Sequence, residues 1–304
     1  RMQRFSSAGV LVSNVAYTAS ASGNPSKSFV AIRGDKIYCL ISMFDPSSGE
    51  RTRMYVYDIP SLDWVGGGQW LEGTGIFMET TTAEFGDTHY FIMGFREYFP
   101  TEQGFYQKRR LSDNGVVLQS NFAGYPGEVE RSGDDTFIAN RSTSGTPGQL
   151  MVMRIGALLD TKAVNAYDPG GLFNGVLSAD GSTFYSLARS SSTFVYVRPF
   201  NVAAGTFGSP TAYNFGGAPT VFVKDRQPHG SSDAGFVIGS TDTNWFLRTT
   251  PTSVTANVLD VPGGGFARLG RDANGNSVAM MGWNLNDQRF IRSVRLSRST
   301  GAPM

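Results

Sequence analysis

The chain has 304 residues and a net charge of +1, from 26 basic and 25 acidic side chains. No global field would therefore attract nucleic acid or an anionic membrane, and without a run of 18 apolar residues we expect no membrane insertion. Charged residues make up only 17%, whereas the 37 glycines are typical of short strands joined by tight turns. These features predict an all-β protein.

Glycine-rich breaks divide the chain at intervals of 46 to 51 residues. Spacing this even indicates structural repeats, each of about 48 residues. We therefore expect one domain over residues 1–304, with residues 1–22 standing outside the repeats. The breaks lie at Gly23, Gly73, Gly124, Gly170, Gly216 and Gly263.

The same order of segments recurs in each repeat. A Gly, Asp or Asn turn is followed by a short apolar strand, a variable polar loop, a strand of alternating character and a weaker fourth strand. Four antiparallel strands per repeat of this length are typical of a β-propeller blade, so the sequence predicts a six-bladed β-propeller. The second strands begin at Ile37, Tyr90, Thr136, Thr183, Gly235 and Ser277, and the third strands at Arg53, Phe105, Leu150, Phe194, Trp245 and Phe290.

The last repeat ends without a fourth strand. The segment from Val10 to Tyr17 has strand character and no repeat of its own. We therefore expect it to pair with the strand from Phe290 to Leu296, because that pairing would cover two open edges at once.

Two segments resemble motifs of known propeller families. Residues 56–64 (VYDIPSLDW) resemble the strand, turn and tryptophan of kelch repeats, and residues 177–185 (LSADGSTFY) resemble the turn of YVTN-type blades. Each motif occurs once, and the diglycine of kelch blades is missing. The resemblance therefore implies the β-propeller class and transfers no site residues.

Residues with catalytic or metal-binding chemistry are few. The two histidines, His89 and His229, are expected at turns between first and second strands of different blades, which disfavours a triad or a zinc site. The segment from Asp272 to Asn276 lacks the carboxylates of a calcium loop and is interpreted as a turn. We predict no catalytic residue, no metal and no cofactor.

The opposite ends of the blades are richer in residues suited to binding. Aromatic rings and arginines there are the side-chain types that contact sugars and protein hot spots. The segment 94–104 is expected to be the longest loop of this face. An open alternative is that the two tryptophans only pack between blades. The candidate binding residues are Arg96, Tyr98, Phe99, Arg141, Arg189, Trp245, Trp283 and Arg289.

Two functions remain open on sequence grounds. The leading hypothesis is a non-enzymatic binding or scaffold module, secreted, cell-surface or virion-associated, that contacts a protein or glycan and could belong to a larger assembly. The alternative is a carbohydrate-active enzyme, a glycosidase or lyase, that uses a pair of carboxylates as acid and base. Its candidates are Glu72, Glu79, Glu97, Glu102, Glu128, Asp242 and Asp287.

Overall fold

The computed structural model contains two compact units, residues Arg1–Pro126 and Gly127–Met304. Every regular element in the described part of the chain is a β-strand, and none of its segments is a helix long and apolar enough to cross a membrane. The described residues are 2–6, 8–15, 24–45, 49–71, 77–98, 101–143, 149–156, 159–165, 173–189, 194–215, 221–224, 233–239, 243–262, 266–274, 276–285, 288–297 and 300–304.

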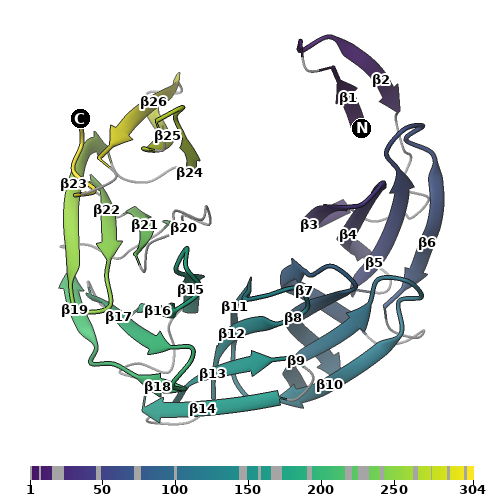
Figure 1. Ribbon diagram of the computed structural model, residues 1–304, viewed down its shortest axis with the longest axis horizontal. Coiled ribbons are helices and arrows are strands. Elements are labelled where there is room, and N and C mark those ends of the chain that lie inside the picture. Colours follow the sequence, from purple (N-terminus) through teal and green to yellow (C-terminus); the bar gives the residue numbers. More distant parts are fainter. Residues whose placement is uncertain are drawn as a thin grey trace. The chain divides into compact units, whose positions relative to one another are not determined.

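The first unit contains a hairpin and two four-stranded antiparallel sheets (Figure 1). The hairpin pairs β1 (Met2–Phe5) with β2 (Leu11–Val15). The first sheet has the order β3 (Asn24–Arg33), β4 (Lys36–Asp45), β5 (Gly49–Asp58) and β6 (Trp64–Trp70). The second sheet has the order β7 (Phe77–Phe85), β8 (His89–Tyr98), β9 (Thr101–Arg110) and β10 (Val116–Phe122).

The second unit contains four antiparallel sheets (Figure 1). The first of these sheets contains β11 (Pro126–Arg131), β12 (Phe137–Ser142), β13 (Gln149–Ile155) and β14 (Leu159–Asn165), and the second contains β15 (Phe173–Leu177), β16 (Thr183–Arg189), β17 (Phe194–Asn201), β18 (Thr206–Phe207) and β19 (Thr211–Asn214). The third contains β20 (Val221–Lys224), β21 (Ala234–Gly239), β22 (Thr243–Thr249) and β23 (Val254–Pro262). The fourth contains β24 (Phe266–Arg271), β25 (Ser277–Leu285) and β26 (Gln288–Leu296).

The six sheets confirm the repeats predicted from the sequence. Each repeat forms one sheet, every predicted second and third strand is present, and all six glycine-rich breaks fall between sheets. Gly124, the one break glycine in the described residues, has a φ of +124°, which a residue with a Cβ rarely adopts. Among the described residues the last sheet has three strands, as expected.

Two details differ from the expectations. The predicted loop over residues 94–104 is wrong, because β8 and β9 continue through it as a paired hairpin up to Tyr98 and Thr101. Its polar residues are strand residues, and polarity alone does not distinguish the exposed end of a hairpin from a loop. In addition, Leu11–Val15 pairs with the unpredicted strand Met2–Phe5. Its pairing with β26, which belongs to the other unit, stays a prediction.

Apolar side chains fill the space between neighbouring sheets. In the first unit Leu40 and Met54 pack against Tyr90, Ile92 and Phe105 of the next sheet, and all five are buried. In the second unit three such clusters join the successive sheets. Because alternate residues of a strand face opposite sides, one sheet contributes to the core on both of its faces.

Buried polar side chains also join neighbouring sheets. Asn140 of β12 is fully buried; its Oδ1 accepts a hydrogen bond from the Glu128 amide at 2.8 Å, and its Nδ2 donates to Asn174 O at 2.8 Å and to Ser186 Oγ at 3.1 Å. Two glycines leave the space for it. A Cβ on Gly127 would lie 2.3 Å from Asn140 Oδ1. One on Gly175 would lie 2.4 Å from Phe184 Cζ and 3.3 Å from Asn140 Nδ2.

A comparable contact occurs in the first unit. The hydroxyl of Thr52 lies 2.8 Å from that of Ser42 in its own sheet and 3.1 Å from that of Thr80 in the next sheet. All three residues are buried. Hydrogen bonds therefore satisfy these polar groups where they cross from one sheet to the next.

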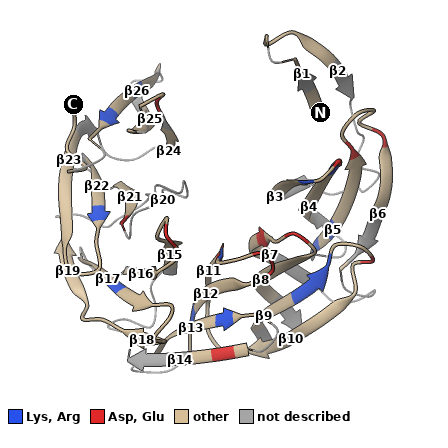
Figure 2. Cartoon of the chain, in the orientation of Figure 1, with Lys and Arg blue, Asp and Glu red and all other residues tan. Residues whose placement is uncertain are grey.

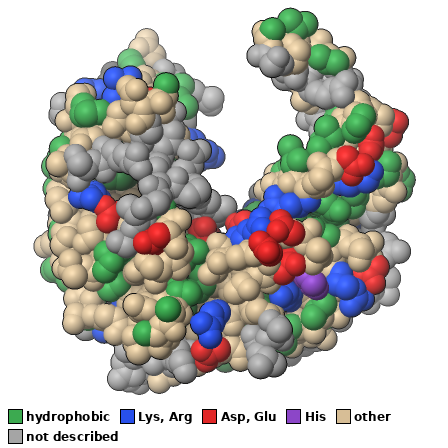
Figure 3. Space-filling view, in the orientation of Figure 1, with side chains coloured by type: hydrophobic (Ala, Val, Ile, Leu, Met, Phe, Trp, Pro, Cys, Tyr) green, Lys and Arg blue, Asp and Glu red, His purple; other side chains and the backbone are tan. Residues whose placement is uncertain are grey.

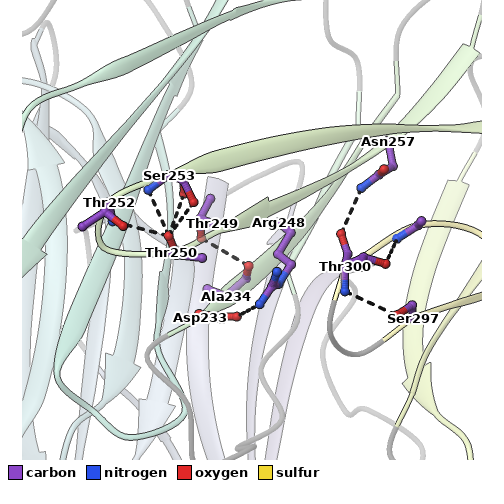
Figure 4. A network of polar contacts seen from close by, with 11 residues as sticks. Asp233, Ala234, Arg248, Thr249, Thr250, Thr252, Ser253, Asn257, Ser297 and Thr300 are labelled. Carbon is purple, nitrogen blue, oxygen red and sulfur yellow. Dashed lines mark hydrogen bonds and ion pairs between the residues drawn. The ribbon is translucent and has the colours of Figure 1, made fainter.

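The C-terminal segment folds back along the end of β26. The Met304 amide donates to Arg295 O at 3.0 Å, and Leu296 forms an isolated β-bridge with Pro303. Figure 4 shows that the segment also reaches the preceding sheet, where Asn257 Nδ2 donates to Thr300 O at 3.4 Å. In the same network Arg248 pairs with Asp233. The last two sheets are thus linked by polar contacts as well as by their apolar core.

Candidate functional site

The two ends of each sheet differ in their connections. At the turn end the first strand passes into the second, and at the hairpin end the second strand passes into the third. All eight predicted site residues belong to hairpin ends, within a few residues of the turn or, for Phe99, between the two strands. Arg96, Tyr98 and Phe99 belong to the first unit, and the other five belong to the second.

Only part of this set can be placed by its side chains. Arg141 is half-buried at the end of β12, and Trp245 and Trp283 are half-buried in β22 and β25. Four others, Arg96, Tyr98, Arg189 and Arg289, are placed as strand residues by their backbone alone, and Phe99 lies outside the described residues.

Trp245 packs between two sheets of the second unit. Its ring meets that of Phe215 edge to face, with centroids 5.6 Å apart, and both belong to the apolar cluster that includes Leu247 and Phe236. Its Nε1 is buried and has no hydrogen-bond partner among the described residues. This packing is the one that the open alternative from the sequence anticipated for the tryptophans.

Trp283 combines packing with exposure. It lies against the cluster of Met281 and Leu296 and stacks on Phe290, the residue directly opposite on β26, with centroids 5.6 Å apart and rings inclined by 16°. Phe290 is 37% exposed. The pair therefore has one half-buried member and one exposed member, and the packing of Trp283 against the core holds the exposed ring in place.

Similar aromatic pairs occur at two other hairpin ends. In the first unit Phe95 meets Tyr125 edge to face at 6.2 Å, and Tyr125 is 52% exposed. In the second unit Phe194, 36% exposed, stacks with Tyr196 at 6.5 Å. Sequence reasoning missed these residues and Phe290, although alternate aromatics at the start of a third strand were a readable signal for Phe194 and Tyr196.

The candidate carboxylates do not assemble into a described acid–base pair. Glu128 is half-buried in β11, and its backbone amide donates to Asn140 Oδ1. Glu79, Glu97 and Glu102 are strand residues whose side chains are not described. Glu72, Asp242 and Asp287 lie outside the described residues. The enzyme hypothesis thus stays open.

The turn ends are organised by ion pairs and by hydrogen bonds to the backbone. Arg33 donates from Nε to Gly86 O at 2.6 Å and from Nη2 to Phe85 O, and these hydrogen bonds link the first sheet to the second. Lys36 Nζ lies 2.9 Å from Asp58 Oδ1, and this hydrogen bond lowers the pKa of Asp58. Figure 2 marks charged stretches along the strands, and Figure 3 shows side chains of both signs around the purple histidine.

Aspartates in the turns accept hydrogen bonds from backbone amides. Hydrogen bonds from Arg110 and from the Gly115 amide lower the pKa of Asp113 to about 2. Asp272 Oδ1 accepts from the amides of Asn274 and Asn276, and Arg295 Nε lies 2.9 Å from its Oδ2, so this segment is a turn, as predicted. The described residues hold no group of three or more acids, histidines or cysteines that could bind a metal.

The histidine and the cysteine also show no catalytic geometry in the described residues. His89 is half-buried at the start of β8, on the turn end as expected, with its Nδ1 2.8 Å from Thr88 Oγ1. His229 lies outside the described residues. Cys39 is buried, and burial raises the pKa of its thiol to about 11. A thiol in this state is not a nucleophile at neutral pH.

Comparison with solved structures bears on the fold. The periplasmic gluconolactonase PpgL of Pseudomonas aeruginosa is similar with a TM-score of 0.60 at 14% identity, over 99% of this chain and 89% of that one. The hydrazine synthase of Kuenenia stuttgartiensis is similar with a TM-score of 0.58 at 12% identity, over 88% and 80% of the chains. The endosialidase of phage phi92 has a TM-score of 0.50 at 6% identity, over 90% and 67%.

These comparisons define the class of fold. The similar structures are of the β-propeller type, and the antiparallel sheets of this chain are blades of that type. No model of a known protein family matches the chain, and no curated protein sequence matches it either. At identities of 6 to 14% the likeness extends to the fold alone.

Proposed function

We propose that the chain is a non-enzymatic binding module that contacts a protein or a glycan through the hairpin ends of its blades. The observation that carries this proposal is the recurrence of aromatic pairs with one exposed member, seen at Tyr125, Phe194 and Phe290. Aromatic side chains supply large contact areas at a small entropic cost, and they dominate the energetics of many interfaces. The arginines predicted from the sequence would add polar contacts at the same ends.

Composition supports an extracellular setting for this module. The chain is poor in charge and rich in glycine, and we propose that it is a secreted, cell-surface or virion protein, as a separate molecule or as part of a larger assembly. Fractionation of the native source, with detection of the chain in the culture medium, envelope or particle fraction, tests this setting. Recovery from the cytosol alone would contradict it.

A carbohydrate-active enzyme is the second candidate. It is favoured by the similar folds of a gluconolactonase and an endosialidase, and it would use two of the hairpin-end carboxylates as acid and base. A glycan array run beside a panel of glycosidase and lyase assays separates the two functions. Binding without turnover supports the binding module, whereas turnover of any sugar reverses the ranking.

The binding residues are tested by substitution. Replacing Tyr98 and Trp283 by Ala is expected to weaken binding by about 1 to 3 kcal/mol each if they are anchors. Residues that only pack between sheets would instead lower the melting temperature and leave the affinity of the folded molecules unchanged. Both quantities are measured on the same preparations, by calorimetric titration and by thermal melting.

We further propose that six blades close through the N-terminal segment, with Val10 to Tyr17 pairing beside Phe290 to Leu296. Exposed apolar residues on both segments support this pairing, since Val10 is 63% and Ile291 66% exposed. Unpaired edges of this kind favour association. Deletion of residues 1–20 should then lower stability or cause aggregation. A truncated chain with unchanged thermal stability would contradict the closure.

A further inference from the structure

The last sheet and the segment that follows it carry an unusual charge. Residues 266–304 contain six arginines and two aspartates, with no lysine or glutamate, so their net charge is +4 against +1 for the whole chain. Figure 2 shows part of this charge on β26. One aspartate, Asp272, lies 2.9 Å from Arg295 and is used within the sheet. An anionic ligand is therefore favoured here over a neutral or cationic one.

The register of β25 and β26 places an arginine beside the stacked aromatic pair. Trp283 lies opposite Phe290 and Met281 lies opposite Arg292, so these four residues share one face of the sheet. Met281 is buried against the preceding sheet, whereas Phe290 is 37% exposed and Arg292 is also exposed. Phe290 and Arg292 belong to a face of β26, so a strand that pairs with the edge of β26, as proposed above, would lie beside this face and not over it.

We propose that this face binds a carboxylate-bearing sugar, such as a uronic or sialic acid residue of a glycan. The proposal rests on the binding function proposed above and names its ligand class. An aromatic ring stacks against the apolar C–H face of a pyranose, and a guanidinium forms a bidentate pair with a carboxylate. Phe290, held in place by Trp283, supplies the ring, and Arg292 supplies the guanidinium two residues further along the same face.

The chemistry favours one sugar acid over a long polyanion. The two exposed residues used here, Phe290 and Arg292, lie two positions apart on a single strand. Their backbone spacing is about 6.6 to 6.8 Å, which is on the scale of one sugar residue. Arg295 lies on the opposite face of the sheet and cannot reach the same sugar residue. A nucleic acid would instead require basic groups spread along its backbone.

The experiment uses the full chain on a glycan array with sialylated and uronate-containing oligosaccharides, their neutral parents and their carboxyl methyl esters. We expect binding to the carboxylated sugars and an at least tenfold loss on esterification, because the ester keeps the ring but removes the charge. Arg292→Gln and Phe290→Ala should each lose at least tenfold. Arg268→Gln removes the same charge from an exposed residue on the opposite face of the sheet and should lose less than twofold.

The outcomes separate this inference from the broader proposal. Binding of neutral parents or esters as tightly as of the acids would overturn the inference and leave a glycan-binding module. Equal losses for Arg268→Gln and Arg292→Gln, or binding of single-stranded DNA in place of sugar acids, would overturn it as well. A chain that binds no glycan refutes it, and the wider binding function then depends on a protein partner.

Discussion

The turn ends and the hairpin ends of the sheets are built from different chemistry. At the turn ends charged groups contact the protein itself: Arg33 reaches the backbone of the next sheet, and Lys36 pairs with Asp58. At the hairpin ends the described residues instead include exposed rings that pack against a second ring, such as Tyr125 and Phe290. An exposed ring also occurs at a turn end, where Trp64 donates its Nε1 hydrogen to the backbone of Gly66. Groups already satisfied within the protein have little left to offer a ligand, whereas half-exposed rings retain apolar surface. On the proposed binding function, we therefore expect changes at the turn ends to act mainly on stability and changes at the hairpin ends to act mainly on binding.

The largest expected effect is at the buried Asn140, whose hydrogen bonds link two sheets. It lies near the hairpin end of β12, and yet its substitution should change stability and not binding. Asn140→Ala leaves the Glu128 amide, Asn174 O and Ser186 Oγ without their partner, and should cost about 3 kcal/mol of unfolding free energy. Urea unfolding followed by circular dichroism measures it. The exposed Asn121→Ala is the control, and equal midpoints for the two variants would contradict the assignment.

Trp283 tests the difference between packing and binding at a hairpin end, because it packs against the core and also stacks on the exposed Phe290. Trp283→Ala should lower stability by about 2 kcal/mol and also weaken ligand binding, since it removes both the packing and the support of Phe290. Phe290→Ala should weaken binding at a stability cost below about 1 kcal/mol. Thermal melting with binding titration separates the effects. A larger stability loss for Phe290→Ala than for Trp283→Ala would reverse the roles.

Arg33 tests whether a residue at a turn end affects stability without affecting binding. Arg33→Met removes the donors to Gly86 O and Phe85 O and should lower stability by about 1 kcal/mol, with no change in affinity for any ligand. Arg110→Met, whose ion pair with Asp113 is exposed and lies within its own sheet, is the matched control and should shift the unfolding midpoint less than Arg33→Met does. A change in affinity for Arg33→Met would show that the turn end also takes part in recognition.

The smallest effect is expected for the pH dependence of Asp113. Its folded pKa of about 2 lies below the unfolded value of about 4. The carboxylate therefore contributes its stability in full above about pH 4 and loses it as the pH falls toward 2. Asp113→Asn should make the melting temperature less dependent on pH between about pH 2 and pH 4. Substitution of the highly exposed Asp134 by Asn is the control. An unchanged slope would show that the pair with Arg110 contributes nothing.

The sequence predicted the strands better than the contacts between them. Alternating and apolar runs were sufficient for the second and third strands, since each run reports burial directly. The hairpin at Tyr98 and Thr101 was missed because its polar residues look like a loop. The pairing of Trp283 with Phe290 depends on the register of two strands, which the sequence of either strand alone does not reveal. The role of Asn140 depends on its burial, which a single polar residue does not indicate.

The hydrogen bonds of the buried Asn140 limit which substitutions this chain can accept one at a time. The asparagine from one repeat occupies space left by a glycine of its own sheet, Gly127, and by a glycine of the next, Gly175. A side chain at Gly127 would collide with the asparagine, and one at Gly175 would collide with Phe184 and crowd the asparagine. Loss of the asparagine leaves its polar partners unsatisfied. These positions therefore tolerate joint changes better than single ones. Repeats of similar length in this chain are consequently not interchangeable parts, since this one is matched to the neighbour that follows it.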